Sequence, residues 1–86
     1  MTWKIEWDDS AVKQLRKLDK QIEKRIIAHV KKIPLNDPRK QGKPLTGDKA
    51  GLWRYRMGEY RIVCSIIDHE LVVLIVGIGH RKEIYN

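Results

Sequence analysis

Three strand-like runs follow one another in the C-terminal half of the sequence, and they constrain the fold more than any other feature. They cover residues 52–57, 60–67 and 71–78, and short turns at Gly58-Glu59 and Asp68-His69-Glu70 separate them. Turns this short join antiparallel neighbours. The third run is apolar throughout, so we expect it to be central in an antiparallel sheet.

The N-terminal half predicts one further strand and two helices. In residues 2–7 the apolar positions Trp3, Ile5 and Trp7 alternate with polar ones, which indicates a half-buried strand. Apolar residues then recur every three or four positions, first at Ala11, Val12, Leu15 and Leu18, and again at Ile22, Ile26, Val30 and Ile33. Asp8, Asp9 or Ser10 can cap the first helix and Asp19 the second, and Pro34 stops the second.

Residues 34–51 contain all three prolines and three of the six glycines, so we predict a long loop inside one domain. The resulting order is β-α-α-β-β-β. We therefore predict a single domain over residues 1–86 with an α+β fold, in which a two-helix hairpin packs on a four-stranded, mostly antiparallel sheet.

Arginines are concentrated in the first predicted hairpin. A two-residue turn at Gly58-Glu59, with glycine first, sets Arg56 opposite Arg61 and leaves Arg54 on the same face. Like charges directly opposite each other destabilise a sheet, so stability alone does not explain the pair. Guanidinium groups bind phosphate in a bidentate manner, and this face therefore predicts an anion site. In the alternative interpretation Glu59, Asp68 or Glu83 pairs with some of these arginines.

The last residues, from Gly79 to Asn86, add His80, Arg81 and Tyr85 directly after the central run. A histidine titrates near neutral pH, an arginine holds an anion, and a tyrosine stacks on a base or donates a proton. Each of these residues also has a structural interpretation, because turn histidines are commonly solvated and a terminal tyrosine often packs on the surface. Their conjunction with the arginine face favours a catalytic role.

The charge balance favours polyanionic partners. The net charge is +7, and residues 1–43 carry 12 Lys and Arg against 6 Asp and Glu. Eight of these cations lie on the outward helix faces: Lys13, Arg16, Lys17, Lys20, Lys24, Arg25, Lys31 and Lys32. They form either a solvated face, on which the aliphatic parts of the side chains cover the core, or a surface that binds RNA or the ribosome.

Several classes of site are not expected. The three histidines lie on different predicted elements and the single cysteine gives no ligand spacing, so we predict no metal and no cofactor. The sequence has neither a phosphate-binding glycine loop nor a nucleophile elbow. It also has no apolar run of membrane-spanning length and no signal-like N-terminus, and we expect a cytoplasmic protein without a membrane partner.

Taken together, the segments "LRKLD", "KPLTG", "GLWRYRMGEYRIVCSI" and "GHRKEIY" resemble the RelE-type toxins of the RelE/ParE superfamily. The resemblance covers nearly the whole chain. It implies a toxin of a bacterial toxin–antitoxin pair, with a fold related to microbial ribonucleases. It also implies a metal-independent endoribonuclease, an mRNA interferase that inhibits translation by cleaving mRNA in the ribosomal A site. The attacking group is then the RNA 2′-OH, which forms a bond to the adjacent phosphate.

The resemblance also assigns roles to individual residues. Arg61 and Arg81 match positions that hold the phosphate, and Arg54 and Arg56 fall where better-known members have lysines. Tyr85 matches a tyrosine that orients or activates the nucleophile, and His80 occupies a position that is Lys or His in relatives. An arginine cannot act as a general base near neutral pH, so proton transfer falls to Tyr85, to His80 or to the ribosome.

The partners that the resemblance implies are a RelB-like antitoxin, the ribosome and mRNA, and the toxin–antitoxin complex is expected to bind operator DNA through the antitoxin. Two other functions stay open at this point. One is a DNA gyrase inhibitor of the ParE kind, and the other is a non-catalytic basic module that binds RNA or protein.

Overall fold

The computed structural model describes residues 2–80, so Arg81 and Tyr85 lie outside the described part of the chain. Its helices and strands are β1 (Lys4–Trp7), α1 (Asp9–Arg16), α2 (Lys20–Lys31), β2 (Lys43–Pro44), β3 (Trp53–Met57), β4 (Tyr60–Ile67) and β5 (Val72–His80). Three short 3₁₀ helices are η1 (Pro38–Lys40), η2 (Gly47–Lys49) and η3 (Asp68–Glu70). The α+β class is confirmed, and the predicted elements occur in the predicted order, with one additional strand, β2, among them.

Within residues 2–80 the sheet has five strands in the order β1-β5-β4-β3-β2, one more than the four predicted. The additional strand, β2, has only two residues and pairs antiparallel with β3. Its single Lys-Pro step lies within the proline-rich segment, and periodicity cannot reveal so short a strand. β1 pairs parallel with β5 and the other pairs are antiparallel. The apolar β5 is an interior strand, between β1 and β4.

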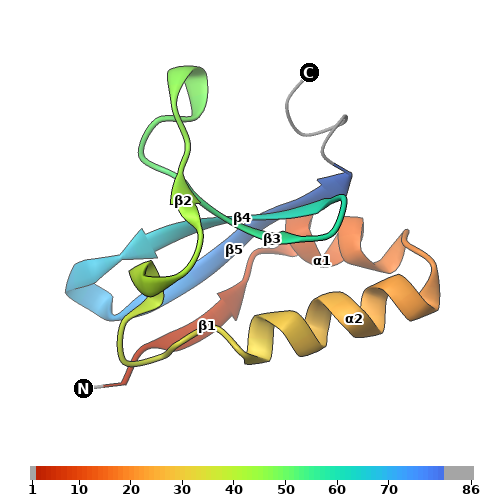
Figure 1. Ribbon diagram of the computed structural model, residues 1–86, viewed down its shortest axis with the longest axis horizontal. Helices are drawn as coiled ribbons and strands as arrows, with labels where there is room; N and C mark the ends of the chain where they lie inside the picture. The colour runs from red at the N-terminus through yellow and green to blue at the C-terminus, as the bar shows by residue number, and fades with distance from the viewer. Residues whose placement is uncertain (1, 81–86) are drawn as a thin grey trace.

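The two helices begin at predicted caps and cover one face of the sheet (Figure 1). The side chain of Asp8 accepts a hydrogen bond from the backbone of Ser10, and that of Asp19 accepts one from Gln21. The core between helices and sheet consists mainly of these buried residues: Ala11, Leu15, Ile26, Val30, Tyr55, Ile62, Cys64, Val73, Ile75 and Ile78. Neither helix within residues 2–80 has the length and apolar character needed to cross a membrane.

The first helix also closes one edge of the sheet. β1 pairs with β5 only as far as Ile75, and beyond that point side chains of α1 satisfy the β5 backbone. The Ser10 hydroxyl donates to the Val76 carbonyl at 3.2 Å, and the Ile78 amide donates to Gln14 Oε1 at 2.7 Å. These contacts hold α1 alongside the C-terminal half of β5.

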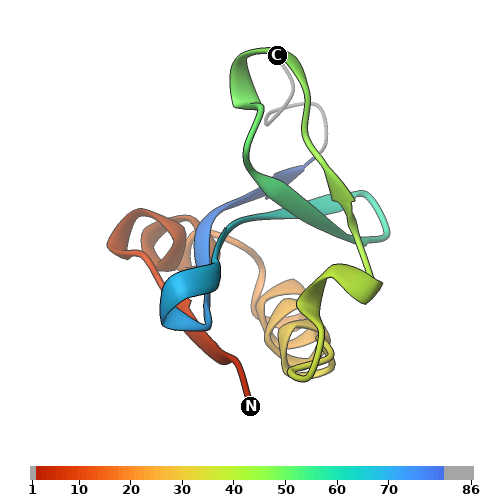
Figure 2. The ribbon, with the colours of Figure 1, turned by 90° about the vertical axis from the view of Figure 1, so that its left-hand side faces the viewer.

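Residues 43–52, which we call the arm, project from the sheet on the side away from the helices (Figures 1 and 2). Indole Nε1 of Trp53 donates to the Gln41 carbonyl at 2.8 Å, and the Leu45 amide donates to the Leu52 carbonyl at 2.9 Å. Gly42, at φ +80°, lies so close to β3 that a Cβ there would be 2.2 Å from the Arg54 carbonyl oxygen. The second half of the predicted loop is thus part of an anchored arm that contains β2 and η2.

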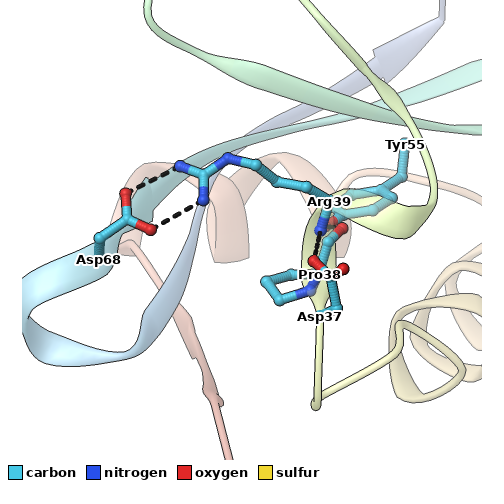
Figure 3. A network of polar contacts seen from close by, with 5 residues as sticks. All are labelled: Asp37, Pro38, Arg39, Tyr55 and Asp68. Carbon is cyan, nitrogen blue, oxygen red and sulfur yellow. Dashed lines mark hydrogen bonds and ion pairs between the residues drawn. The ribbon is translucent and has the colours of Figure 1, made fainter.

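A polar network ties the segment before the arm to the sheet (Figure 3). The buried Tyr55 hydroxyl donates to the Pro38 carbonyl at 2.6 Å, and burial raises the pKa of this tyrosine. Arg39 forms a two-pronged ion pair with Asp68, with both nitrogen–oxygen distances 2.8 Å. Asp68 is therefore bonded to Arg39, at the opposite end of β4 from the Gly58 turn.

Removing the Tyr55 hydroxyl should destabilise the fold, because the buried Pro38 carbonyl then loses its side-chain donor. We expect Tyr55→Phe to lower the free energy of unfolding by about 1–2 kcal/mol in denaturant titrations. Tyr60→Phe removes a hydroxyl from a half-buried tyrosine and serves as the control, with an expected change below about 0.5 kcal/mol. Equal effects of the two substitutions would show that the Pro38 contact contributes nothing.

The Arg39–Asp68 pair should make stability depend on pH. The hydrogen bond from Arg39 lowers the pKa of the Asp68 carboxyl below its ordinary value, so the folded state favours the ionised form. This stabilisation is complete above the unfolded-state pKa and is lost as the pH falls through the folded-state pKa. Asp68→Asn should therefore lower the thermal midpoint near neutral pH and leave it unchanged in strong acid, whereas the exposed Asp48→Asn should change it at neither pH. A constant difference across the pH range would contradict the assignment.

Candidate anion-binding site

The β3–β4 hairpin has the predicted register. Gly58 has φ +58° and Glu59 does not have a positive φ, which fits the predicted turn with glycine in its first central position. Met57 faces Tyr60, and Arg56 faces Arg61. The alternate residues, including Tyr55 and Ile62, enter the core beneath the helices, so the three arginines lie on the outer face of the sheet.

The three arginines differ in their exposure. Arg61 is buried, with only 6% of its surface exposed, whereas Arg54 is half-buried and Arg56 is exposed. One guanidinium nitrogen of Arg61, Nη1, is 3.5 Å from the Tyr60 carbonyl that accepts its hydrogen bond. Burying a charged guanidinium group to this degree costs desolvation free energy, so contacts with the surrounding structure must offset that cost.

A cavity of about 340 Å³ opens between the arm and the arginine face, and we call it the arginine cavity. Its lining is Pro44, Leu45, Thr46, Lys49, Arg54 and Arg61. Two arginines from the hairpin and a lysine from the arm thus surround one space, together with the hydroxyl-bearing Thr46. This arrangement suits a phosphate, because guanidinium, ammonium and hydroxyl groups all donate hydrogen bonds to its oxygens.

Sequence reasoning missed Lys49 and Thr46. Both belong to the arm, which has no helical or strand periodicity, and no local signal shows that it folds back toward Arg61. The segment "KPLTG", which contains Thr46 but not Lys49, contributed to the family resemblance, and the resemblance assigned neither residue a role.

The cationic surface continues past the arginine cavity. A second hollow, of about 270 Å³, is lined in part by His29, Lys43, Arg54 and Arg56. Arg54 lines both hollows, and Lys43 is its partner in the β2–β3 pairing. The structure thus brings Arg54 and Arg61 together at one cavity and places Arg56 at its neighbour.

His80 lies at the end of β5, where its register partner is Tyr60. The two rings meet edge to face, with centroids 5.7 Å apart and an interplanar angle of 80°. His80 does not line the arginine cavity, although its neighbour Gly79 is the register partner of Arg61. The cysteine Cys64 is buried in the core, which raises its pKa to about 12 and leaves it protonated near neutral pH.

All eight basic residues predicted on the outward helix faces are exposed: Lys13, Arg16, Lys17, Lys20, Lys24, Arg25, Lys31 and Lys32. Exposure agrees with both interpretations, the solvated face and the docking surface. Lys17 differs in one respect, because it lines a groove of about 670 Å³ that also reaches Lys49 of the arm.

Comparison with known proteins agrees with this architecture. Residues 5–85 match the family described as the ParE toxin of type II toxin–antitoxin systems, parDE. The chain is 32% identical to Toxin RelG of Mycobacterium tuberculosis, over all of this chain and 99% of that protein. It is 27% identical to the mRNA interferase toxin RelE of Escherichia coli K12, over all of this chain and 93% of that protein.

A similar fold occurs in the toxin–antitoxin complex RelBE2 of Mycobacterium tuberculosis. The TM-score is 0.84 at 27% identity, and the match covers 94% of this chain and 93% of the other. The fold, the family match and the relatives agree with the resemblance seen in the hairpin and C-terminal motifs. The chain therefore belongs to the RelE/ParE superfamily, as a RelE-type toxin of a toxin–antitoxin system.

Proposed function

We propose that this toxin is a ribosome-dependent endoribonuclease that cleaves mRNA in the ribosomal A site and thereby inhibits translation. The observation that carries the proposal is the arginine cavity, where a buried arginine, a half-buried arginine and Lys49 surround a space open to the outer face. The name of the Escherichia coli relative, an mRNA interferase, supports the same activity.

The chemistry suits a site built from cations. The 2′-oxygen loses its proton and forms a bond to the adjacent phosphorus, and the bond from phosphorus to the 5′-oxygen breaks. The 5′-oxygen takes up a proton, so the products are a 2′,3′-cyclic phosphate and a 5′-OH. Negative charge accumulates on the phosphoryl oxygens in the transition state, and fixed cations stabilise it there more than in the ground state.

Within this mechanism Arg61 and Arg54 hold the phosphoryl oxygens, and Arg56 contacts the strand beyond the cavity. Arg81 is proposed as a further phosphate ligand from the segment outside the described residues. The proton-transfer group is proposed to be Tyr85 or His80, because a permanently protonated guanidinium cannot accept the proton of the 2′-OH. None of these steps requires a metal ion from the protein.

The partners in this proposal are the ribosome with its mRNA, and a RelB-like antitoxin that neutralises the toxin. Structures of similar fold include toxin–antitoxin complexes from Mycobacterium tuberculosis and Escherichia coli. In the proposal the basic helix faces bind ribosomal RNA, and the complex with antitoxin binds operator DNA through the antitoxin.

The first test is cleavage itself. Adding the toxin to a translating extract and mapping the new 5′ ends should show cuts within codons that occupy the A site. Intact messages accompanied by DNA damage in cells would instead select a gyrase inhibitor of the ParE kind. Intact messages with unimpaired growth would select a non-catalytic binding module.

Arg61 should contribute to the chemical step. We expect Arg61→Ala to lower the single-turnover cleavage rate on saturating ribosomes by ~100-fold or more, as for loss of one oxyanion donor. Arg16→Ala removes an exposed helix arginine and is the matched control, with an expected unchanged rate at saturation. Denaturant unfolding checks that Arg61→Ala is folded, and Arg61→Lys, which keeps the charge, should recover part of the rate. A normal rate for folded Arg61→Ala would make the cavity a docking surface only.

Binding to ribosomes should depend steeply on salt if the helix faces contact RNA. Each phosphate contact releases a counterion, so the logarithm of the affinity falls linearly with the logarithm of the salt concentration. Replacing Lys13, Lys24 and Lys31 with Gln should flatten this slope without moving the cleavage position. A slope that is unchanged by the triple substitution would assign these lysines to the solvated face.

A further inference from the structure

A groove of about 670 Å³ lies beside the arginine cavity, and the phosphate mechanism does not use it. It runs across the outer face of the sheet between α1 and the arm, and Lys49 lines both hollows. One wall is formed by Gln14, Lys17 and Leu18 of α1, and the other by Lys49 and Leu52 of the arm.

The floor of the groove is a part of the sheet from which few side chains project. Gly77 is the register partner of Val63, and Gly79 is the register partner of Arg61. Because alternate residues share a face, these two glycines leave a strip of β5 without side chains directly next to Val63 and Arg61. The result is a surface of low side-chain relief beside the arginine cavity, on which half-buried Gly77 is more accessible than Val63 and Gly79, which are buried.

Charge favours one class of occupant. The groove has an ammonium group at each side, Lys17 from α1 and Lys49 from the arm, and both residues are exposed. When Arg54 and Arg61 bind a phosphate of an RNA strand, the base of the adjacent nucleotide lies close to the arginine cavity. A planar base fits on the flat strip at Gly77, with the apolar side chains of Leu18 and Leu52 on the two walls, and the flanking lysines suit the phosphates on either side of it.

We propose that this groove binds the base of an RNA nucleotide adjacent to the phosphate in the arginine cavity, an inference that rests on the proposed function. The base lies on Gly77, while Lys17 and Lys49 contact the neighbouring backbone. The groove then contributes to affinity, and to the choice of nucleotide at that position.

Gly77 gives a test that changes no charge. A Cβ at this position would lie 3.6 Å from Gln14 Oε1 and 4.0 Å from Val63 Cβ, both ordinary contacts, so a Cβ is accommodated and a branched side chain would take up space in the groove. Gly77→Val is the blocking variant. Ser65→Val introduces the same valine side chain at half-buried Ser65 on β4, away from the groove lining, and is the control.

The probe is a ribosome programmed with mRNA whose A-site codon has 2′-deoxy sugars, so that toxin binding is measured without cleavage. Each codon nucleotide is made abasic in turn. For the wild type and Ser65→Val, loss of one particular base should weaken binding by ~10-fold, within the range for base contacts. For Gly77→Val the intact codon should bind as weakly as the abasic one, and the difference between them should vanish.

The outcomes separate this inference from the proposed function. If Arg61→Ala weakens binding but no abasic position weakens that of the wild type, the groove holds no base and the inference is wrong while the function stands. That measurement does not depend on how well Gly77→Val folds. If Gly77→Val still binds the abasic codon more weakly than the intact codon but no longer binds the antitoxin, the groove is a protein-docking site. The inference is then again wrong. If the wild type does not bind programmed ribosomes, both proposals fail.

Discussion

The register of the β3–β4 hairpin determines the rest of this structure. Gly58, in a left-handed conformation, closes a two-residue turn, and the turn sets Arg56 opposite Arg61. A slip of one residue would send Tyr55 and Ile62 to the outer face and the arginines into the core beneath the helices. The same register therefore makes the hydrophobic core and the cationic face at once, and neither can change without the other.

The arm converts that face into a cavity. A row of arginines on an open sheet would be fully solvated, and its interaction with a phosphate would be weakened by water. The arm lies over one end of the row and adds Lys49, while Trp53 and Gly42 fix its base against β3. The network of Tyr55, Pro38, Arg39 and Asp68 holds the preceding segment (Figure 3). Residues that have no role in the proposed reaction thus determine where Lys49 lies.

Most of the fold could be predicted from the sequence because its signals are local. The alternation in β3 and β4, the caps at Asp8 and Asp19, and the glycine-first turn each follow from a few neighbouring residues. The two-residue β2 and the position of the arm could not be predicted, since both depend on contacts with β3 that have no periodic pattern. For the same reason the prediction placed Arg54 and Arg61 on one face of the sheet but did not bring Lys49 to it. The sequence also could not show that His80 meets Tyr60 rather than lining the arginine cavity.

The central claim is that the arginine cavity holds a phosphodiester while the neighbouring 2′-oxygen attacks it. The most direct measurement is the chemical identity of the RNA ends after the toxin acts on programmed ribosomes. The account predicts a 2′,3′-cyclic phosphate on the upstream fragment and a 5′-OH on the downstream fragment, with no cleavage when a 2′-deoxy sugar replaces the attacking nucleotide. Fragments with a 3′-OH and a 5′-phosphate, or cleavage of the 2′-deoxy message, would contradict it.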